Sequence, residues 1–124
     1  MEKPRVLVVD DELDQVEIIR DWLADEYLVE IFTSSLAALA ALEARTYDLL
    51  ITDFSMPELN GAQLAAQVSK FEKNRDIPVI LLTGLQDDLA LMVIRSIPKI
   101  RLVEKPVRRV DFLPIVSESI KVLH

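Results

Sequence analysis

The chain has 124 residues, of which 51% are apolar, so it fits one folded domain over residues 1–124 and is not a largely disordered protein. It has no cysteine and its only histidine is residue 124, which excludes a thiolate metal site and leaves oxygen ligands for any metal. The net charge of −7 arises in residues 1–30, which hold ten acidic and three basic residues, and so acidic a chain is a poor nucleic-acid binder.

Apolar runs and helical periodicity alternate along the chain. Residues 5–9 form the first predicted strand, and residues 14–25 carry apolar side chains at helical spacing. Residues 27–32 are predicted to form an edge strand, because Glu30 interrupts their apolar pattern. The later elements expected are a helix from 34 or 35 to 44, a strand over 48–53, a helix over 61–73, a strand over 78–82, a helix over 87–97, a strand over 100–103 and a helix over 109–122.

Five strands that alternate with five helices predict an α/β domain, a doubly wound parallel sheet with helices on both faces. Parallel strands end at one edge of such a sheet, where ligands bind. Asp10 and Asp11 follow the first strand, Asp53 ends the third, Thr83 the fourth, and Lys105 follows the fifth. We therefore expect three carboxylates, a hydroxyl and an ammonium group to converge at this edge.

Carboxylates this close together need a counter-charge. Two of them about 4 Å apart repel by roughly 4 kcal/mol near a protein surface. Mg²⁺ neutralises such a cluster, since it binds one or two carboxylates together with waters and a phosphate. Taken singly, each residue also fits an ordinary role: Asp53 or the Asp pair as a cap, Thr83 in a turn, Lys105 in a surface loop. Their arrival at one edge favours a shared site.

The motifs resemble the receiver domain of two-component response regulators over essentially the whole chain. The resemblance rests on residues 6–11, 48–61, 78–84 and 103–106 and on the spacing between them. It implies a flavodoxin-like fold with the strand order 2-1-3-4-5.

The resemblance also implies the role of the acidic residues. Asp53 would accept a phosphoryl group from a phosphohistidine on a sensor histidine kinase or a phosphotransfer protein. Asp11, Asp53 and the backbone carbonyl of Ser55 would bind Mg²⁺ directly, and Asp10 would do so mainly through water. Such a chain would be a signalling protein, with no enzymatic activity beyond its own phosphorylation and dephosphorylation.

Three further residues would hold the phosphoryl oxygens in this family: Lys105, the Thr83 hydroxyl and the Gly84 N–H. Transfer of this kind depends on alignment and neutralised charge more than on acid–base groups. Family members often carry Tyr or Phe three residues before the lysine, whereas this chain has Leu102. Thr83 and Leu102 are therefore the expected switch residues. We expect Thr83 still to sense the phosphoryl group, but the conformational response to be muted or differently routed.

The helix expected over residues 87–97 is apolar on most of its sides. A helix of this kind usually has a second partner, which predicts a homodimer or effector surface on this helix, the last strand and the last helix. A lone exposed apolar residue is the ordinary alternative, and it stays open.

Two other functions stay open at this point. The complete set of acidic residues, Thr83 and Lys105 argues against a docking module that works without phosphorylation, whereas Leu102 leaves that function open. A Mg²⁺-dependent phosphohydrolase is less favoured, because residue 55 is serine and not a second acid. No apolar run reaches membrane-span length and the first residues are not a signal peptide, so we expect a cytoplasmic protein without membrane contact.

Overall fold

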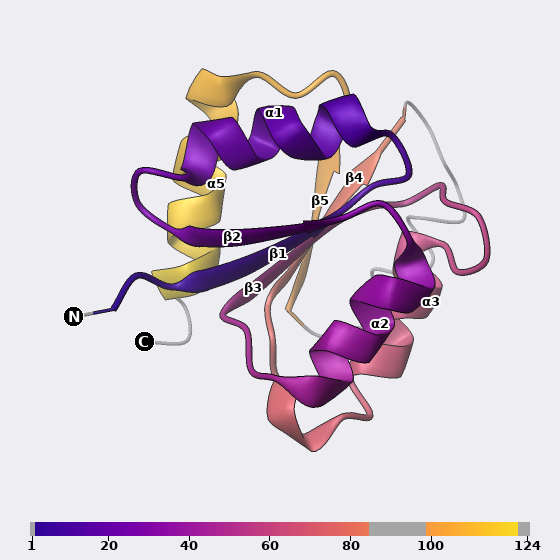
Figure 1. The fold of residues 1–124 in the computed structure, drawn as a ribbon. Helices are drawn as coiled ribbons and strands as arrows, with labels where there is room; N and C mark the ends of the chain where they lie inside the picture. Colours follow the sequence, from indigo (N-terminus) through magenta and orange to yellow (C-terminus); the bar gives the residue numbers. More distant parts are fainter. Residues whose placement is uncertain (1, 85–98, 122–124) are drawn as a thin grey trace.

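The computed structural model describes residues 2–84 and 99–121 of the chain. Its strands are β1 (Arg5–Val9), β2 (Leu28–Phe32), β3 (Leu49–Asp53), β4 (Val79–Thr83) and β5 (Ile100–Glu104). Its helices are α1 (Leu13–Leu23), α2 (Ser35–Ala44), α3 (Gly61–Val68), the short 3-10 helix η1 (Glu72–Asn74) and α5 (Arg109–Lys121), as Figure 1 shows. The helix predicted over residues 87–97 lies outside the described residues.

All strand pairs are parallel, in the order β2-β1-β3-β4-β5. This confirms the predicted sheet and the edge position of the strand that carries Glu30. Helices α1 and α5 cover one face of the sheet, and α2 and α3 cover the other (Figure 1). Every residue of β3 and β4 is buried, which explains why these strands are continuous apolar runs.

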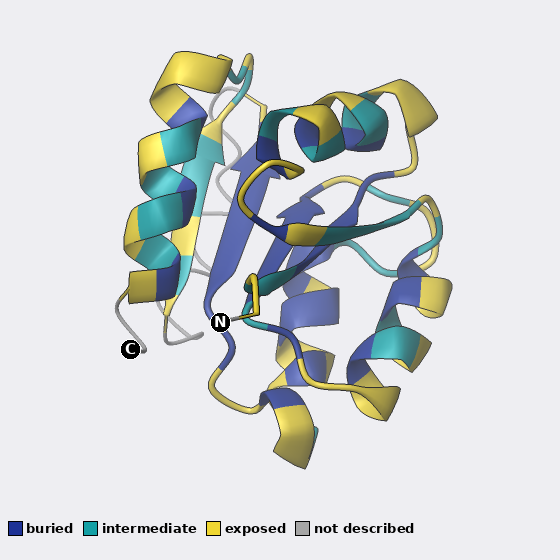
Figure 2. Cartoon of the chain, turned by 60° about the vertical axis from the view of Figure 1, so that its left-hand side comes forward, coloured by how far each residue is buried: buried dark blue, intermediate teal, exposed yellow. Residues whose placement is uncertain are grey.

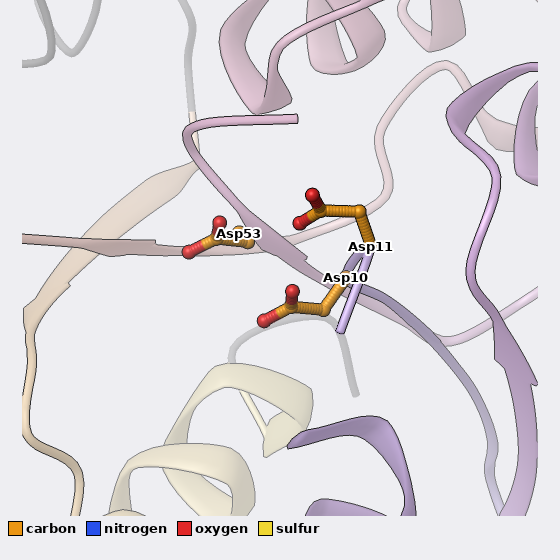
Figure 3. Close-up of side chains that lie close together, drawn as sticks. All are labelled: Asp10, Asp11 and Asp53. Carbon is orange, nitrogen blue, oxygen red and sulfur yellow. The ribbon is translucent and has the colours of Figure 1, made fainter. Parts of the chain in front are cut away.

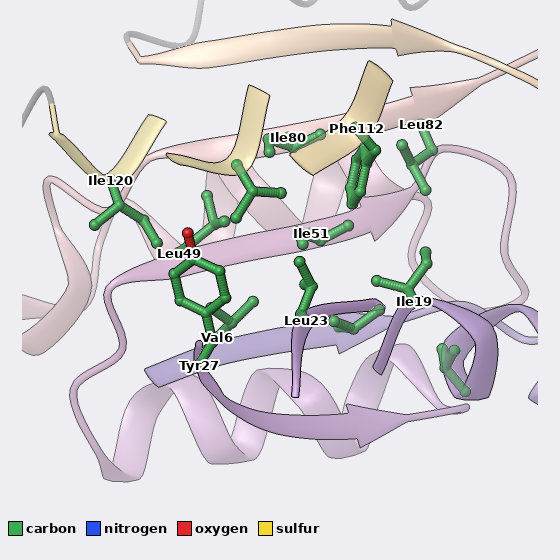
Figure 4. Close-up of a cluster of buried hydrophobic side chains, with 13 residues drawn as sticks. Val6, Ile19, Leu23, Tyr27, Leu49, Ile51, Ile80, Leu82, Phe112 and Ile120 are labelled. Carbon is green, nitrogen blue, oxygen red and sulfur yellow. The ribbon is translucent and has the colours of Figure 1, made fainter. Parts of the chain in front are cut away.

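The core has one cluster on each face of the sheet. Figure 4 shows Ile19 and Leu23 of α1 beside Phe112 and Ile120 of α5, over the apolar side chains of β1, β3 and β4. Burying a side chain of this size stabilises the fold by about 1.5–3 kcal/mol. The outward faces of the helices are mostly exposed or intermediate, whereas the central strands are buried (Figure 2).

The helix predicted over residues 61–73 is wrong in its second part, where α3 has already ended. The buried side chain of Asn74 explains the difference. Its Nδ2 donates to the carbonyl oxygens of Leu42 at 2.6 Å and Arg45 at 2.8 Å, and its Oδ1 accepts from the Tyr47 N–H at 2.9 Å. These bonds hold the chain beside the end of α2 and form η1 in place of a longer helix. The other described elements agree with the predicted bounds to within two residues.

The start of α3 is fixed tightly against the end of β3. Asn60 and Gln63 form a reciprocal capping pair, in which the side chain of each accepts from the other's backbone N–H at 2.8 and 2.9 Å. At Gly61 a Cβ atom would overlap the carbonyl oxygen of Asp53 and the side chain of Leu81. Only glycine therefore allows the helix to begin this close to the strand.

Among the described residues, no helix combines the length and the apolar character that crossing a membrane requires.

Candidate functional site

The acidic residues meet because β1 and β3 are neighbours in the sheet. Val9 pairs with Thr52, so Asp10 and Asp53, each one residue further along, leave the sheet side by side. Asp11 follows on the β1–α1 loop. The three side chains point into one region (Figure 3), and one carboxylate oxygen from each lies within 4.8 Å of the other two. The predicted convergence of the three carboxylates is therefore present.

The three carboxylates differ in their exposure to solvent. Asp10 and Asp53 are buried, with 2% and 5% of their surface exposed, and Asp11 is exposed. Asp10 Oδ1 accepts from the Glu12 backbone N–H at 3.0 Å, whereas Asp10 Oδ2 is buried and has no hydrogen-bond partner among the described residues. Burial, together with the nearby charge of Asp53, raises the pKa of Asp10 to about 6 although the Glu12 N–H opposes the shift.

Lys105 supplies the positive charge of the site. It follows β5, and its Nζ forms an ion pair with Asp53 Oδ1 and lies 4.0 Å from Asp10 Oδ2. Its backbone N–H donates to the carbonyl of Thr83 at 2.7 Å, and its bond to Pro106 is cis. Burial alone would lower the pKa of Lys105, but the hydrogen bond and charge of Asp53 outweigh it and raise that pKa.

Thr83 reaches the same edge at the end of β4, where it pairs with Glu104. Its side chain is buried, and its hydroxyl donates to the Gly84 carbonyl at 3.2 Å and not to a carboxylate. Gly84 is exposed, with open space where a Cβ would stand. The structure thus brings Asp10, Asp11, Asp53 and Lys105 close together, and Thr83 and Gly84 follow at the end of β4.

The two remaining predicted residues are Ser55, in the loop after β3, and Leu102 of β5. Ser55 is exposed, two residues past Asp53. Leu102 of β5 is partly buried and packs against a small cluster that contains Phe54, Ala62 and Leu81. Leu102 is therefore already directed toward the interior.

Sequence reasoning missed the contribution of Glu12, whose backbone N–H holds Asp10. The signal was present, because an aspartate side chain often accepts from the N–H two residues later. Sequence reasoning also missed a cavity of about 510 Å³ beside the site. Trp22 of α1, Leu82 of β4, Lys105 and Pro106 contribute to its lining, so it opens between α1 and the β5–α5 loop.

Comparisons with known proteins agree on one family. Residues 6–117 match the profile of the response regulator receiver domain. The chain is 31% identical over 106 residues to the cyclic di-GMP phosphodiesterase response regulator RpfG of Xanthomonas campestris, a match that covers 83% of the chain and 28% of that protein. It is 34% identical over 87 residues to the sensor histidine kinase TmoS of Ectopseudomonas mendocina, which covers 70% of the chain and 9% of that protein.

A comparison of structures supports the fold. The chemotaxis protein CheY4 of Vibrio cholerae superposes with a TM-score of 0.87 at 22% identity, over 94% of this chain and 98% of the other. The chain spans well under two thirds of the two curated relatives above, so their whole activities belong to larger proteins.

Proposed function

Since the chain belongs to the response regulator receiver domain family, we propose that it accepts a phosphoryl group on Asp53 in two-component signalling. Receiver domains are typically non-enzymatic signalling modules, and the acidic pocket with its lysine is consistent with that role. The observation that carries the proposal is the ion pair between Lys105 and Asp53 inside a cluster of three carboxylates. The ion pair holds the Asp53 carboxylate in place. The negative charge of the cluster that Lys105 does not balance favours the binding of a cation.

The residues present fit Mg²⁺. The acidic triad of Asp10, Asp11 and Asp53 is typical of the receiver magnesium site, and Asp10 Oδ2 is a buried oxygen without a hydrogen-bond partner among the described residues, with Lys105 Nζ 4.0 Å away. In our proposal Asp11, Asp53 and the Ser55 carbonyl hold the ion directly, and Asp10 holds it through water. When bound, the ion neutralises the carboxylates and the oxygens of an incoming phosphoryl group.

The transfer itself is a displacement at phosphorus. A carboxylate oxygen of Asp53 forms the new P–O bond, the P–N bond of the donor phosphohistidine breaks, and the imidazole nitrogen keeps the electron pair and takes a proton. Lys105 orients the carboxylate beforehand and then balances the charge of the phosphoryl oxygens. The Thr83 hydroxyl gives up its bond to the Gly84 carbonyl and donates to a phosphoryl oxygen. The Gly84 N–H donates to a phosphoryl oxygen as well.

The proposed donor is a sensor histidine kinase or a phosphotransfer protein. The similarity to named regulators and to a named sensor kinase supports this class of partner. The proposed output is a homodimer or effector surface formed by residues 87–97, β5 and α5, switched through Thr83 and Leu102. Residues 87–97 lie outside the described residues, so this part rests on the sequence pattern.

Intact mass spectrometry after incubation with acetyl phosphate and Mg²⁺ tests the proposal. We expect the native chain to gain one phosphate and Asp53→Asn to gain none. Asp48→Asn, which removes a carboxylate at the opposite end of β3, is the matched control and should be labelled like the native chain. A native chain that takes no phosphate would support a docking module, and sustained turnover of a phosphate ester would support a phosphohydrolase.

A further inference from the structure

Ser35, the first residue of α2, holds the loop that follows Asp53. Its side chain is buried, with 2% of the residue exposed. Its hydroxyl donates to the carbonyl of Pro57 at 3.0 Å and accepts from the N–H of Leu59 at 3.1 Å. Both partners belong to the β3–α3 loop, more than 20 positions away in the sequence. Ser35 thus ties the β3–α3 loop, which follows Asp53, to the start of α2.

Ser35 is not needed to cap its own helix. The neighbouring Ser34 does so, because its hydroxyl oxygen accepts from the Ala37 N–H at 3.2 Å. The two adjacent serines therefore have different roles: the Ser34 hydroxyl bonds within α2, and the Ser35 hydroxyl bonds to the β3–α3 loop.

The loop depends on this attachment at its tip. Its base is already closed, since Gly61 N–H donates to the Phe54 carbonyl at 2.8 Å and Phe54 N–H donates to the Leu82 carbonyl at 2.7 Å. At the tip, Glu58 has a φ of 69°, a left-handed conformation that is unfavourable for a residue other than glycine. The two hydrogen bonds of Ser35 lie on either side of Glu58 and hold it there.

The same segment also holds the first acidic loop. The carbonyl of Phe32, at the end of β2, accepts from the Asp10 N–H at 3.1 Å. Residues 32–35 therefore contact both Asp10 and the loop that carries Ser55. A displacement of either loop changes the distance between the carboxylates of Asp10 and Asp11 and the carbonyl of Ser55.

We infer that Ser35 is a positioning residue for the metal and phosphoryl site, since its hydroxyl fixes the β3–α3 loop and hence the Ser55 carbonyl relative to the acidic triad. The inference rests on the proposed function for its metal site. Ser35 touches neither the metal ligands nor the phosphoryl group, so it acts through the loop. Partners of this kind typically change metal affinity by 10- to 100-fold when they are removed.

The test compares Ser35→Ala with Ser34→Ala. Each variant removes one hydroxyl from the same turn of α2, but only the first detaches the loop. Calorimetric titration with Mg²⁺ alone should show affinity weakened about tenfold in Ser35→Ala and unchanged in Ser34→Ala, although the lost cap lowers the melting temperature of Ser34→Ala. Hydrogen exchange at the Leu59 amide should be faster in Ser35→Ala only. Ser35→Thr, which keeps a hydroxyl, should restore most of the Mg²⁺ affinity.

The outcomes separate this inference from the proposed function. If the native chain binds Mg²⁺ and is phosphorylated, but Ser35→Ala binds Mg²⁺ as tightly as the native chain, the positioning role is wrong and the proposed function stands. If Ser35→Ala weakens Mg²⁺ binding while the native chain takes no phosphate, the proposed function fails and the positioning role stands. Equal weakening in Ser34→Ala would also overturn the positioning role, because it would trace the effect to α2 as a whole.

Discussion

The Oδ2 atom of Asp10 lies 4.0 Å from Nζ of Lys105, while Lys105 makes its closer ion pair with Asp53. A single ammonium group is thus shared between two buried carboxylates, and Asp11 adds a third negative charge at the surface. The free protein therefore carries unbalanced negative charge at this edge of the sheet. Its stability and its affinity for cations both depend on that charge.

Asp10→Asn should stabilise the metal-free protein by about 3 kcal/mol at pH 7, because it removes a buried charge whose pKa is raised to about 6. The pKa in the folded state lies above the unfolded value of 3.8, so the group favours folding most below that value and loses this contribution as the pH rises through 6. Urea unfolding in EDTA at pH 4.5 and pH 7 should show a smaller pH dependence in the variant. Asp11→Asn, an exposed control, should gain less; equal gains would contradict the burial argument.

Binding of Mg²⁺ should release protons in the same pH range. Near pH 6 Asp10 is about half protonated in the free protein, so the ion displaces up to about half a proton there and almost none at pH 8. Calorimetry in two buffers of different ionisation enthalpy measures this number. Asp10→Asn should release none through this group, and a native chain that released no proton at pH 6 would refute the assignment.

Lys105→Met should bind Mg²⁺ more tightly, because the lysine competes for Asp53 in the free state. We expect about a fivefold gain, equivalent to roughly 1 kcal/mol of removed repulsion. Labelling by acetyl phosphate should nevertheless be slower, since the phosphoryl oxygens lose a cation. Lys99→Met is the matched control, because Lys99 lies at the opposite end of β5 and pairs only with Asp76, at 4.0 Å, among the ion pairs described. Weaker Mg²⁺ binding in Lys105→Met would contradict the competition.

Gly61→Ala should destabilise the fold by about 1–3 kcal/mol, although alanine is the better helix former. The added Cβ would overlap the carbonyl oxygen of Asp53 and the Leu81 side chain, and the backbone oxygen cannot move aside easily. Gly84→Ala places its Cβ in open space and should change the free energy of unfolding little. Thermal and urea unfolding of both variants check the sign, and a more stable Gly61→Ala would show that α3 can shift away from β3.

Because residue 102 is leucine, the amide chemical shifts of β5 should change little when beryllofluoride is added with Mg²⁺. Its side chain already packs toward Phe54 and Leu81, so no large side chain is available to turn inward from the surface. Amide chemical shifts should change more around Phe54 and the start of α3 than along β5. Leu102→Tyr is the informative comparison and should enlarge the β5 response. A large response of β5 in the native chain would contradict the rerouted signal.

The positions of the strand ends could be predicted because each depends on a short sequence pattern that recurs along the chain. Each apolar run ends in a polar residue, and parallel pairing brings those ends to one edge, so Asp10, Asp53 and Lys105 were predictable as neighbours. The different surroundings of these three side chains in the folded protein could not be predicted. Asp10 Oδ2 is buried without a hydrogen-bond partner among the described residues, and the pattern of the strand ends does not predict this.

The features that the sequence did not reveal depend on contacts between distant residues. Asn74 ends the helical stretch through bonds to the end of α2, and nothing around residue 74 signals those partners. Ser35 looks like one of two equivalent helix caps until its bonds to the β3–α3 loop are known. Glu30 marked an edge strand correctly, but its bonds to Tyr47 at 2.8 Å and Arg5 at 2.6 Å were not foreseen.

Trp22 is the only tryptophan of the chain, and it shares the cavity beside the site with Lys105 while its ring contacts Phe112, with centroids 6.1 Å apart. Its indole emission is therefore a built-in reporter of this side of the molecule. A change in the lysine or in the β5–α5 loop alters the surroundings of a single fluorophore, so stopped-flow experiments can time ligand arrival on the unlabelled protein.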